Sequence, residues 1–251
     1  MKNILKNWKR EAFYVTVLLF GVLALASGTA LFSMAMQYRT AERSYLEIRE
    51  EFAQETPLGK QAAALQTRID FARLRREYPE SVGWLSVEGT TLDYPVMYAQ
   101  DNDAYLNHAA DGSENPAGAI FLDCRNDADF SNENSVIFGH NLRNGAMFGL
   151  LPKYEDAAYA GAHPAIVLTD GRGETEYAVF SVHVTTAGSA SYTRSFPDRE
   201  EYRRFLTEMK ELSLYDTGVP VDGCGRMLTL STCTNGAQEE RLVVQAICLG
   251  E

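Results

Sequence analysis

The chain has 251 residues, with 23 lysines and arginines against 34 aspartates and glutamates. This length suffices for one domain of up to about 200 residues and an appendage. The net charge of −11 argues against a nucleic-acid partner, because a phosphate backbone repels an acidic protein surface.

The first apolar segment, residues 12–36, contains no charged residue and reads AFYVTVLLFGVLALASGTALFSMAM. A helix needs about 20 apolar residues to cross a bilayer, so this segment predicts a single transmembrane helix. A cleaved signal peptide is the alternative, since Ala24, Ala26 and Ser27 are small residues of the kind found at cleavage sites. An uncleaved anchor is favoured, because the apolar run continues well past them.

Basic residues precede this segment: Lys2, Lys6, Lys9 and Arg10, opposed only by Glu11. The positive-inside rule then predicts a cytoplasmic tail at residues 1–11 and export of everything after the span. We therefore expect a single-pass protein of the cell membrane with an extracellular domain. The part after residue 11 keeps 19 basic and 33 acidic residues, so it too would repel nucleic acid.

Residues 37–78 predict a helical stalk that packs on the domain after it. Pro57-Leu58-Gly59 breaks this stalk, and a second helix is expected over roughly 60–77. Apolar residues recur at helical spacing in both parts: Tyr45, Ile48 and Phe52, then Leu65, Ile69 and Ala72. A plain spacer is the alternative, but an all-polar spacer would not need these faces.

Residues 79–251 predict a mostly β domain. Its short apolar runs are rich in Val, Ile, Phe, Tyr and Thr, and Gly, Asn and Asp bound them. Eight such runs are VGWLSV, TLDYPVMY, GAIFLD, SVIFGH, AIVLTD, YAVFSVHVTT, MLTLSTC and RLVVQAICL. Eight short strands of this kind are typical of a barrel or a sandwich.

One helix interrupts the strands at residues 195–213. Pro197 suits its first turn, and the acidic residues after it suit the helix dipole. Its apolar stripe indicates packing on the sheet and consists of Tyr202, Phe205, Leu206, Met209 and Leu212.

The last two strands carry a candidate nucleophile, Cys233, and a candidate cation, Arg241. Side chains alternate between the two faces of a strand, so both residues lie on the face opposite the fully apolar one. A free thiol has a pKa of about 8.5, which a nearby cation lowers, and Arg can also hydrogen-bond an oxyanion. The alternative is a half-buried cysteine, with the arginine paired to Glu239 or Glu240 in solvent.

Acyl transfer on a cysteine also needs an acid–base group, usually His. The four candidates are His108, His140, His163 and His183. His140 is the best placed, because it ends a buried-looking strand and precedes a turn, where functional sites are often built. For any single histidine, a structural role is the alternative.

The four cysteines, Cys124, Cys224, Cys233 and Cys248, form no Cys-x-x-Cys pair. A body of this size does not need disulfides to fold, so we expect mostly free thiols. The histidines and cysteines match no zinc spacing, and we expect no metal and no cofactor.

Together these motifs resemble the class B sortases over about residues 40–251. TLSTC at Thr229–Cys233 with RLVV at Arg241–Val244 resembles their active-site strand pair. SVIFGHNLRNGAMFGLL resembles their histidine segment, and residues 83–108 resemble their first strands. The late helix and the N-terminal helices agree with the same class.

The resemblance implies an eight-stranded sortase β-barrel and a membrane-anchored cysteine transpeptidase of Gram-positive bacteria. Such an enzyme cuts a C-terminal sorting signal of a secreted protein and transfers the product to a cell-wall or pilin amine. By this analogy Cys233 forms a thioester, Arg241 stabilises the oxyanion or orients the substrate, and His140 moves the proton.

The resemblance also implies that Asn102, Leu106 and Ser231 contact the sorting peptide. Many class B members have an acidic residue just after the cysteine, where this chain has Thr234-Asn235. A papain-like hydrolase is disfavoured because no His follows Cys233. The joint presence of Cys, Arg and His argues against a non-catalytic binding module.

Overall fold

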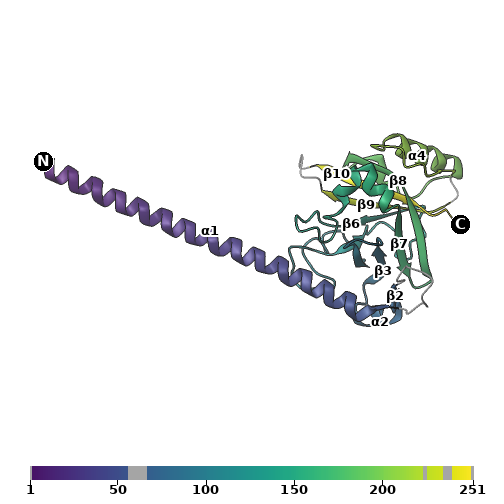
Figure 1. The fold of residues 1–251 in the computed structure, drawn as a ribbon, viewed down its shortest axis with the longest axis horizontal. Coiled ribbons are helices and arrows are strands. Elements are labelled where there is room, and N and C mark those ends of the chain that lie inside the picture. Colours follow the sequence, from purple (N-terminus) through teal and green to yellow (C-terminus); the bar gives the residue numbers. More distant parts are fainter. Residues whose placement is uncertain (1, 56–66, 223–224, 234–238, 250–251) are drawn as a thin grey trace. The chain divides into compact units, whose positions relative to one another are not determined.

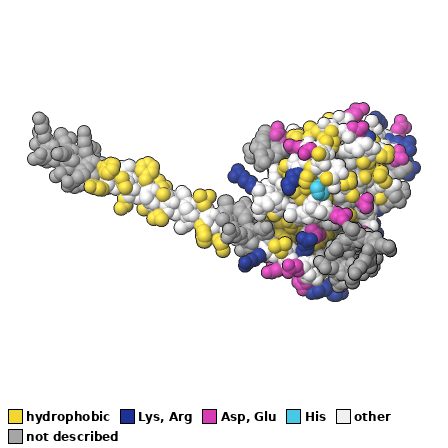
Figure 2. All heavy atoms as spheres, in the orientation of Figure 1, with side chains coloured by type: hydrophobic (Ala, Val, Ile, Leu, Met, Phe, Trp, Pro, Cys, Tyr) yellow, Lys and Arg dark blue, Asp and Glu magenta, His cyan; other side chains and the backbone are white. Residues whose placement is uncertain are grey.

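The computed structural model describes residues 2–55, 67–222, 225–233 and 239–249. They form two compact units, Met1–Ala41 and Glu42–Glu251. The first unit is most of helix α1, Lys2–Phe52, and its stretch Phe13–Ser33 is long and apolar enough to cross a membrane. Apolar side chains of this stretch are exposed around the helix, as Figure 2 shows, which suits a lipid environment.

The second unit is built on a closed eight-stranded β-barrel, which confirms the predicted fold class (Figure 1). Around the barrel the strands follow the order β10-β8-β7-β3-β4-β5-β6-β9. Neighbours pair antiparallel except β4 with β5 and β6 with β9, which are parallel. All eight runs expected from the sequence are these strands, because β-branched and aromatic residues fit a pleated surface.

The strands are β3 Ser81–Ser86, β4 Asp93–Met97, β5 Ile120–Leu122, β6 Asn134–Phe138, β7 Ala165–Asp170, β8 Gly173–Thr186, β9 Met227–Cys233 and β10 Glu240–Ile247. Shorter elements connect them: 3-10 helices η1 Leu151–Glu155 and η2 Ala190–Tyr192, and helices α3 Ala157–Ala162 and α4 Arg199–Glu211.

The end of α1 packs on the barrel through the residues whose spacing predicted a buried face. Tyr45, Ile48 and Phe52 are all buried. The hydroxyl of Tyr45 donates to the carbonyl of Gly118 at 2.9 Å. Arg49 forms an ion pair with the carboxylate of Asp93, at 2.6 Å. Burial and these polar contacts hold this segment against the start of β4 and the loop that precedes β5.

The expected second helix over residues 60–77 is wrong in its first described part. Strand β2, Thr67–Ile69, pairs antiparallel with β1, Ala53–Glu55, and helix α2 spans only Phe71–Glu77. Asp70 caps α2 by accepting a hydrogen bond from the backbone of Arg73, so the helix begins after it. The predicted break at Pro57–Gly59 lies outside the described residues.

Helix α4 is shorter than residues 195–213, because Asp198 caps it through the backbone amides of Glu200 and Glu201. Pro197 therefore precedes the helix rather than opening it. Four residues of the predicted stripe are buried, whereas Leu212 ends the helix and is 51% exposed.

Helix α4 covers one face of the last strands, which we call the outer face (Figure 1). Met227 of β9 and Ile247 of β10 pack there with Leu206 and Met209 of α4. By alternation the same face carries Ser231 and Val243, and the ring of Tyr192 packs on Val243. The opposite face is apolar and fills the barrel. This double cover explains why both faces of β9 and β10 are buried.

Candidate active site

Three neighbouring strands bring the predicted residues into one row. Arg241 of β10 lies directly opposite Cys233 of β9 in the antiparallel register. On the other side β9 runs parallel to β6, with Phe138 opposite Ser231. His140 follows Phe138 by two residues, as Cys233 follows Ser231 by two. By alternation, Arg241 lies on the same face of β10 as Val243, which is the outer face.

Hydrogen bonds continue the pairing of β6 and β9 past the last ladder residue. The amide of Gly139 donates to the carbonyl of Ser231 at 3.3 Å. The hydroxyl of Thr232 donates to the carbonyl of Gly139 at 2.7 Å. These bonds hold the segment that carries His140 beside the end of β9.

His140 is half-buried and is oriented by a backbone carbonyl. Its Nε2 lies 2.7 Å from the carbonyl oxygen of Leu106. A carbonyl only accepts hydrogen bonds, so Nε2 carries a proton, and Nδ1 is the nitrogen that can take up or release one. The neutral imidazole in this tautomer is suited to general base catalysis through Nδ1.

Gly118 lies next to the carbonyl oxygen of Leu106 and leaves room for it. It has a φ of +62°, and a Cβ at this position would lie 2.7 Å from the carbonyl oxygen of Leu106 and 3.0 Å from Cδ2 of His140. Such a contact is far shorter than packing allows, so only glycine lets this loop approach the histidine.

Arg241 is half-buried at the start of β10, between Cys233 of β9 and Thr185 of β8. Its Nη1 donates to the carbonyl of Glu240 at 2.9 Å. A guanidinium has five N–H donors and stays charged at any working pH, so it can also bind an oxyanion.

The other histidines lie elsewhere. Nδ1 of His108 is 2.9 Å from the carbonyl of Ala104, and His163 stacks on the ring of Tyr159. His183 is buried, and burial lowers its pKa to about 4. Placement at the end of β6 therefore distinguishes His140 from the other three.

The three residues that the resemblance assigns to substrate are placed differently from one another. Leu106 is half-buried and meets His140 through its carbonyl. Ser231 is buried, and its hydroxyl is 2.9 Å from the hydroxyl of Tyr192. The amide of Asn102 donates to Asp123 at 3.2 Å and accepts from the backbone of Cys124 at 2.8 Å. Asn102 thus supports a polar cluster beside the row rather than the row itself.

Asp123 is the centre of that cluster and is fully buried. Burial by itself would raise the pKa of this carboxyl, but hydrogen bonds from Arg125 and Asn102 outweigh it, and the pKa lies below its ordinary value. The sequence reasoning missed Asp123, Arg125 and Tyr192. Asp123 ends the predicted strand run GAIFLD, and Arg125 and Tyr192 lie outside the predicted elements, so no local signal marked the three as functional.

Several expectations concern atoms outside the described part of the structure. The side chain of Cys233 is one, and Thr234-Asn235 and Cys224 are others. Within the described ranges, Cys124 and Cys248 form no disulfide. No group of three or more His, Cys, Asp or Glu side chains in those ranges is arranged to hold a metal ion.

Known proteins resemble this chain in both sequence and fold. Residues 85–248 match the sortase domain family. Sortase B of Listeria monocytogenes is 35% identical over 182 residues, which cover 72% of this chain and 74% of that protein. A Staphylococcus aureus sortase B–substrate complex has a TM-score of 0.73 and 26% identity, over 85% of this chain and 98% of that one. Sortase B from Bacillus anthracis also has a TM-score of 0.73, at 32% identity and the same coverage.

Proposed function

Because the chain belongs to the sortase family, and within it to class B, we propose that it cleaves a C-terminal sorting signal through a thioester on Cys233. Sortases are cysteine transpeptidases that anchor surface proteins, and this chain is such an enzyme. The finer proposal rests on one observation, the strand register: Arg241 pairs with Cys233, and Phe138, two residues before His140, pairs with Ser231, two residues before Cys233.

In the proposed first step, the thiol of Cys233 passes its proton to Nδ1 of His140, the sulfur attacks the scissile carbonyl carbon, and Arg241 donates hydrogen bonds to the oxyanion. The carbon–nitrogen bond then breaks, and His140 gives its proton to the leaving amine. An incoming amine attacks the resulting thioester and passes a proton to His140. The carbon–sulfur bond breaks, the new amide leaves, and the thiolate returns.

The Nε2 bond to Leu106 supports this role for His140, because it leaves Nδ1 for both proton transfers. We propose Asn102, Leu106 and Ser231 as further determinants of substrate binding. The substrate is then a secreted protein with a sorting motif. The acceptor is an amine of a peptidoglycan precursor, of a cross-bridge or of a pilin lysine.

The proposed organisation places this chemistry outside the cell. Residues 1–11 form a cytoplasmic tail, 12–36 the membrane span, 37–78 the stalk and 79–251 the catalytic barrel. The apolar stretch Phe13–Ser33 supports a membrane anchor. Exogenous protease on intact cells should digest the barrel epitope and spare a tag at the N-terminus. Digestion of the tag instead would contradict this topology.

The test of the nucleophile uses the full-length chain in detergent micelles with a library of fluorescent peptides and a soluble amine. We expect Cys233→Ala to abolish amine-dependent transfer, because no other group in the row can form a thioester. Cys124→Ala is the matched control and should keep full activity, since Cys124 lies in the loop after β5. Full activity of Cys233→Ala would refute the proposed role of Cys233 as the nucleophile and would favour a non-catalytic binding module.

The test of Arg241 separates its charge from its geometry. Removing one oxyanion donor costs roughly 100- to 1000-fold in turnover, so we expect a fall of this size in kcat for Arg241→Ala. Arg241→Lys keeps the charge but loses the planar fork, and it should recover only part of the rate. An unchanged kcat in Arg241→Ala would refute a transition-state role.

A further inference from the structure

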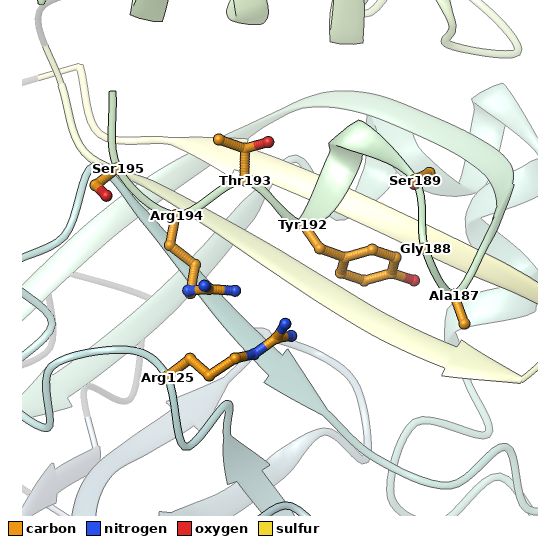
Figure 3. Close-up of a pocket in the computed structure, with 8 residues that line it drawn as sticks. All are labelled: Arg125, Ala187, Gly188, Ser189, Tyr192, Thr193, Arg194 and Ser195. Atoms are coloured by element: carbon orange, nitrogen blue, oxygen red, sulfur yellow. The ribbon is translucent and has the colours of Figure 1, made fainter. Parts of the chain in front are cut away.

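An open pocket of about 360 Å³ lies beside the proposed site. It is lined by Arg125, Ala187, Gly188, Ser189, Tyr192, Thr193, Arg194 and Ser195. Figure 3 shows the guanidinium groups of Arg125 and Arg194 turned toward each other, with the ring of Tyr192 beside them. Two cations facing one space need an explanation, because the extracellular part of this chain is strongly acidic.

The charges around this pocket do not balance. Asp123 is the carboxylate near both arginines. Arg125 donates two hydrogen bonds to it, from Nε at 2.9 Å and from Nη2 at 2.5 Å. Asn102 and the backbone of Arg125 also donate to it. Arg194 reaches Asp123 only at 3.8 Å. Two arginines therefore share one carboxylate, and the lining of the pocket carries a net positive charge.

Donors also remain available. Among the described residues, Nη1 of Arg125 has no hydrogen-bond partner, and the guanidinium of Arg194 has only its long contact to Asp123. Arg194 is 28% exposed and Arg125 54% exposed, so an incoming group can reach both from solvent. A planar pair of N–H donors on each side matches a carboxylate.

The pocket lies on the same face as the proposed catalytic row. The ring of Tyr192 packs on Val136 of β6 and Val243 of β10, and its hydroxyl meets Ser231 of β9. The amide of Asp123 donates to the carbonyl of Val136, so the arginine pair lies level with that residue. His140 follows Val136 by four residues, the first two of them in β6, so the two positions are at most about 13 Å apart at about 3.3 Å per residue.

We propose that Arg125 and Arg194 bind a carboxylate of the substrate, carried about four residues from the scissile bond. An extended peptide over the outer face covers the same 13 Å with about four residues. The carboxylate belongs either to an acidic side chain of the sorting peptide or to the amine acceptor. This inference rests on the proposed function and adds a charge preference to it.

The peptide arm of the test uses full-length protein in detergent micelles and a peptide built on the sequence that the library assay selects. Glu or Gln is placed three, four or five residues from the scissile bond. At one of these positions we expect kcat/KM to be about tenfold higher for Glu, as for other charge-assisted hydrogen bonds. The acceptor arm compares tetraglycine with tetraglycine amide, and a preference for the free acid assigns the carboxylate to the acceptor.

Arg194→Gln is the decisive variant, because its side chain has no short hydrogen bond whose loss would disturb the fold. It should erase the preference for the charged probe and leave kcat/KM for the uncharged probe unchanged. Arg204→Gln on α4, an exposed arginine paired with Glu201, is the matched control and should keep the preference.

Two outcomes would overturn the inference: no preference for a charged probe in either arm, or a preference that survives Arg194→Gln. Neither touches the proposed function, which stands as long as wild type transfers the uncharged probe and Cys233→Ala does not. Failure of the wild type on every probe would instead refute the proposed function, and the inference with it.

Discussion

His183 couples the stability of this domain to pH. The residue is 2% exposed, and the groups that bond its ring are hydroxyls: Ser181 at 3.0 Å from Nδ1 and Ser191 at 3.0 Å from Nε2. Among the described residues no carboxylate bonds the ring, so nothing offsets the cost of charging it in the interior. Burial therefore lowers its pKa from 6.5 to about 4.

The sign follows from comparing the folded and unfolded chains. The unfolded chain binds this proton below about pH 6.5, whereas the folded chain resists it until about pH 4. Stability from neutral His183 is thus present above pH 6.5 and is lost as the pH falls toward 4. The linkage relation gives a loss of about 2 kcal/mol between pH 7.5 and 5, and at most about 3 kcal/mol at lower pH.

The assay is urea denaturation of the full-length chain in detergent micelles at pH 7.5 and 5, followed by fluorescence. His183→Gln keeps hydrogen-bonding capacity but cannot titrate, so its stability should fall less than that of wild type by about 2 kcal/mol. Equal losses in wild type and His183→Gln would refute the reasoning.

Two further predictions concern the supports of the site. Gly118→Ala should lower kcat at least tenfold, because the added Cβ would displace the carbonyl of Leu106 that orients the His140 ring. Gly112 also has a positive φ, but a Cβ there would meet open space, so Gly112→Ala is the control. An equal loss of kcat in Gly112→Ala would contradict this explanation. Tyr192→Phe removes the hydroxyl that meets Ser231 and should cost about 1 kcal/mol in urea denaturation, whereas an unchanged midpoint would show that this bond contributes nothing.

Local patterns were enough for much of this molecule. Each strand of the barrel is a short apolar run bounded by Gly, Asn or Asp, so all eight were recognisable without knowing their partners. The pairing of Cys233 with Arg241 was also accessible, because a short loop joins β9 to β10 and parity then places both on one face.

Prediction failed where pairing at a distance decided the structure. Thr67–Ile69 is a strand because β1 pairs with it, and α4 starts late because Asp198 caps it. The pocket depends on Asp123, at the end of β5, meeting Arg194, in the loop after β8. No periodicity in either segment reports that contact.

The sequence by itself determined the apolar span, the eight strands and the candidate chemistry of Cys233, Arg241 and His140, since composition and alternation are properties of neighbouring residues. Only the tertiary structure decided that β6 lies parallel to β9, so that Phe138, two residues before His140, pairs with Ser231, two residues before Cys233, and that two arginines share one buried aspartate. Both results depend on contacts between segments that are far apart in the sequence, and patterns among neighbouring residues do not encode such contacts.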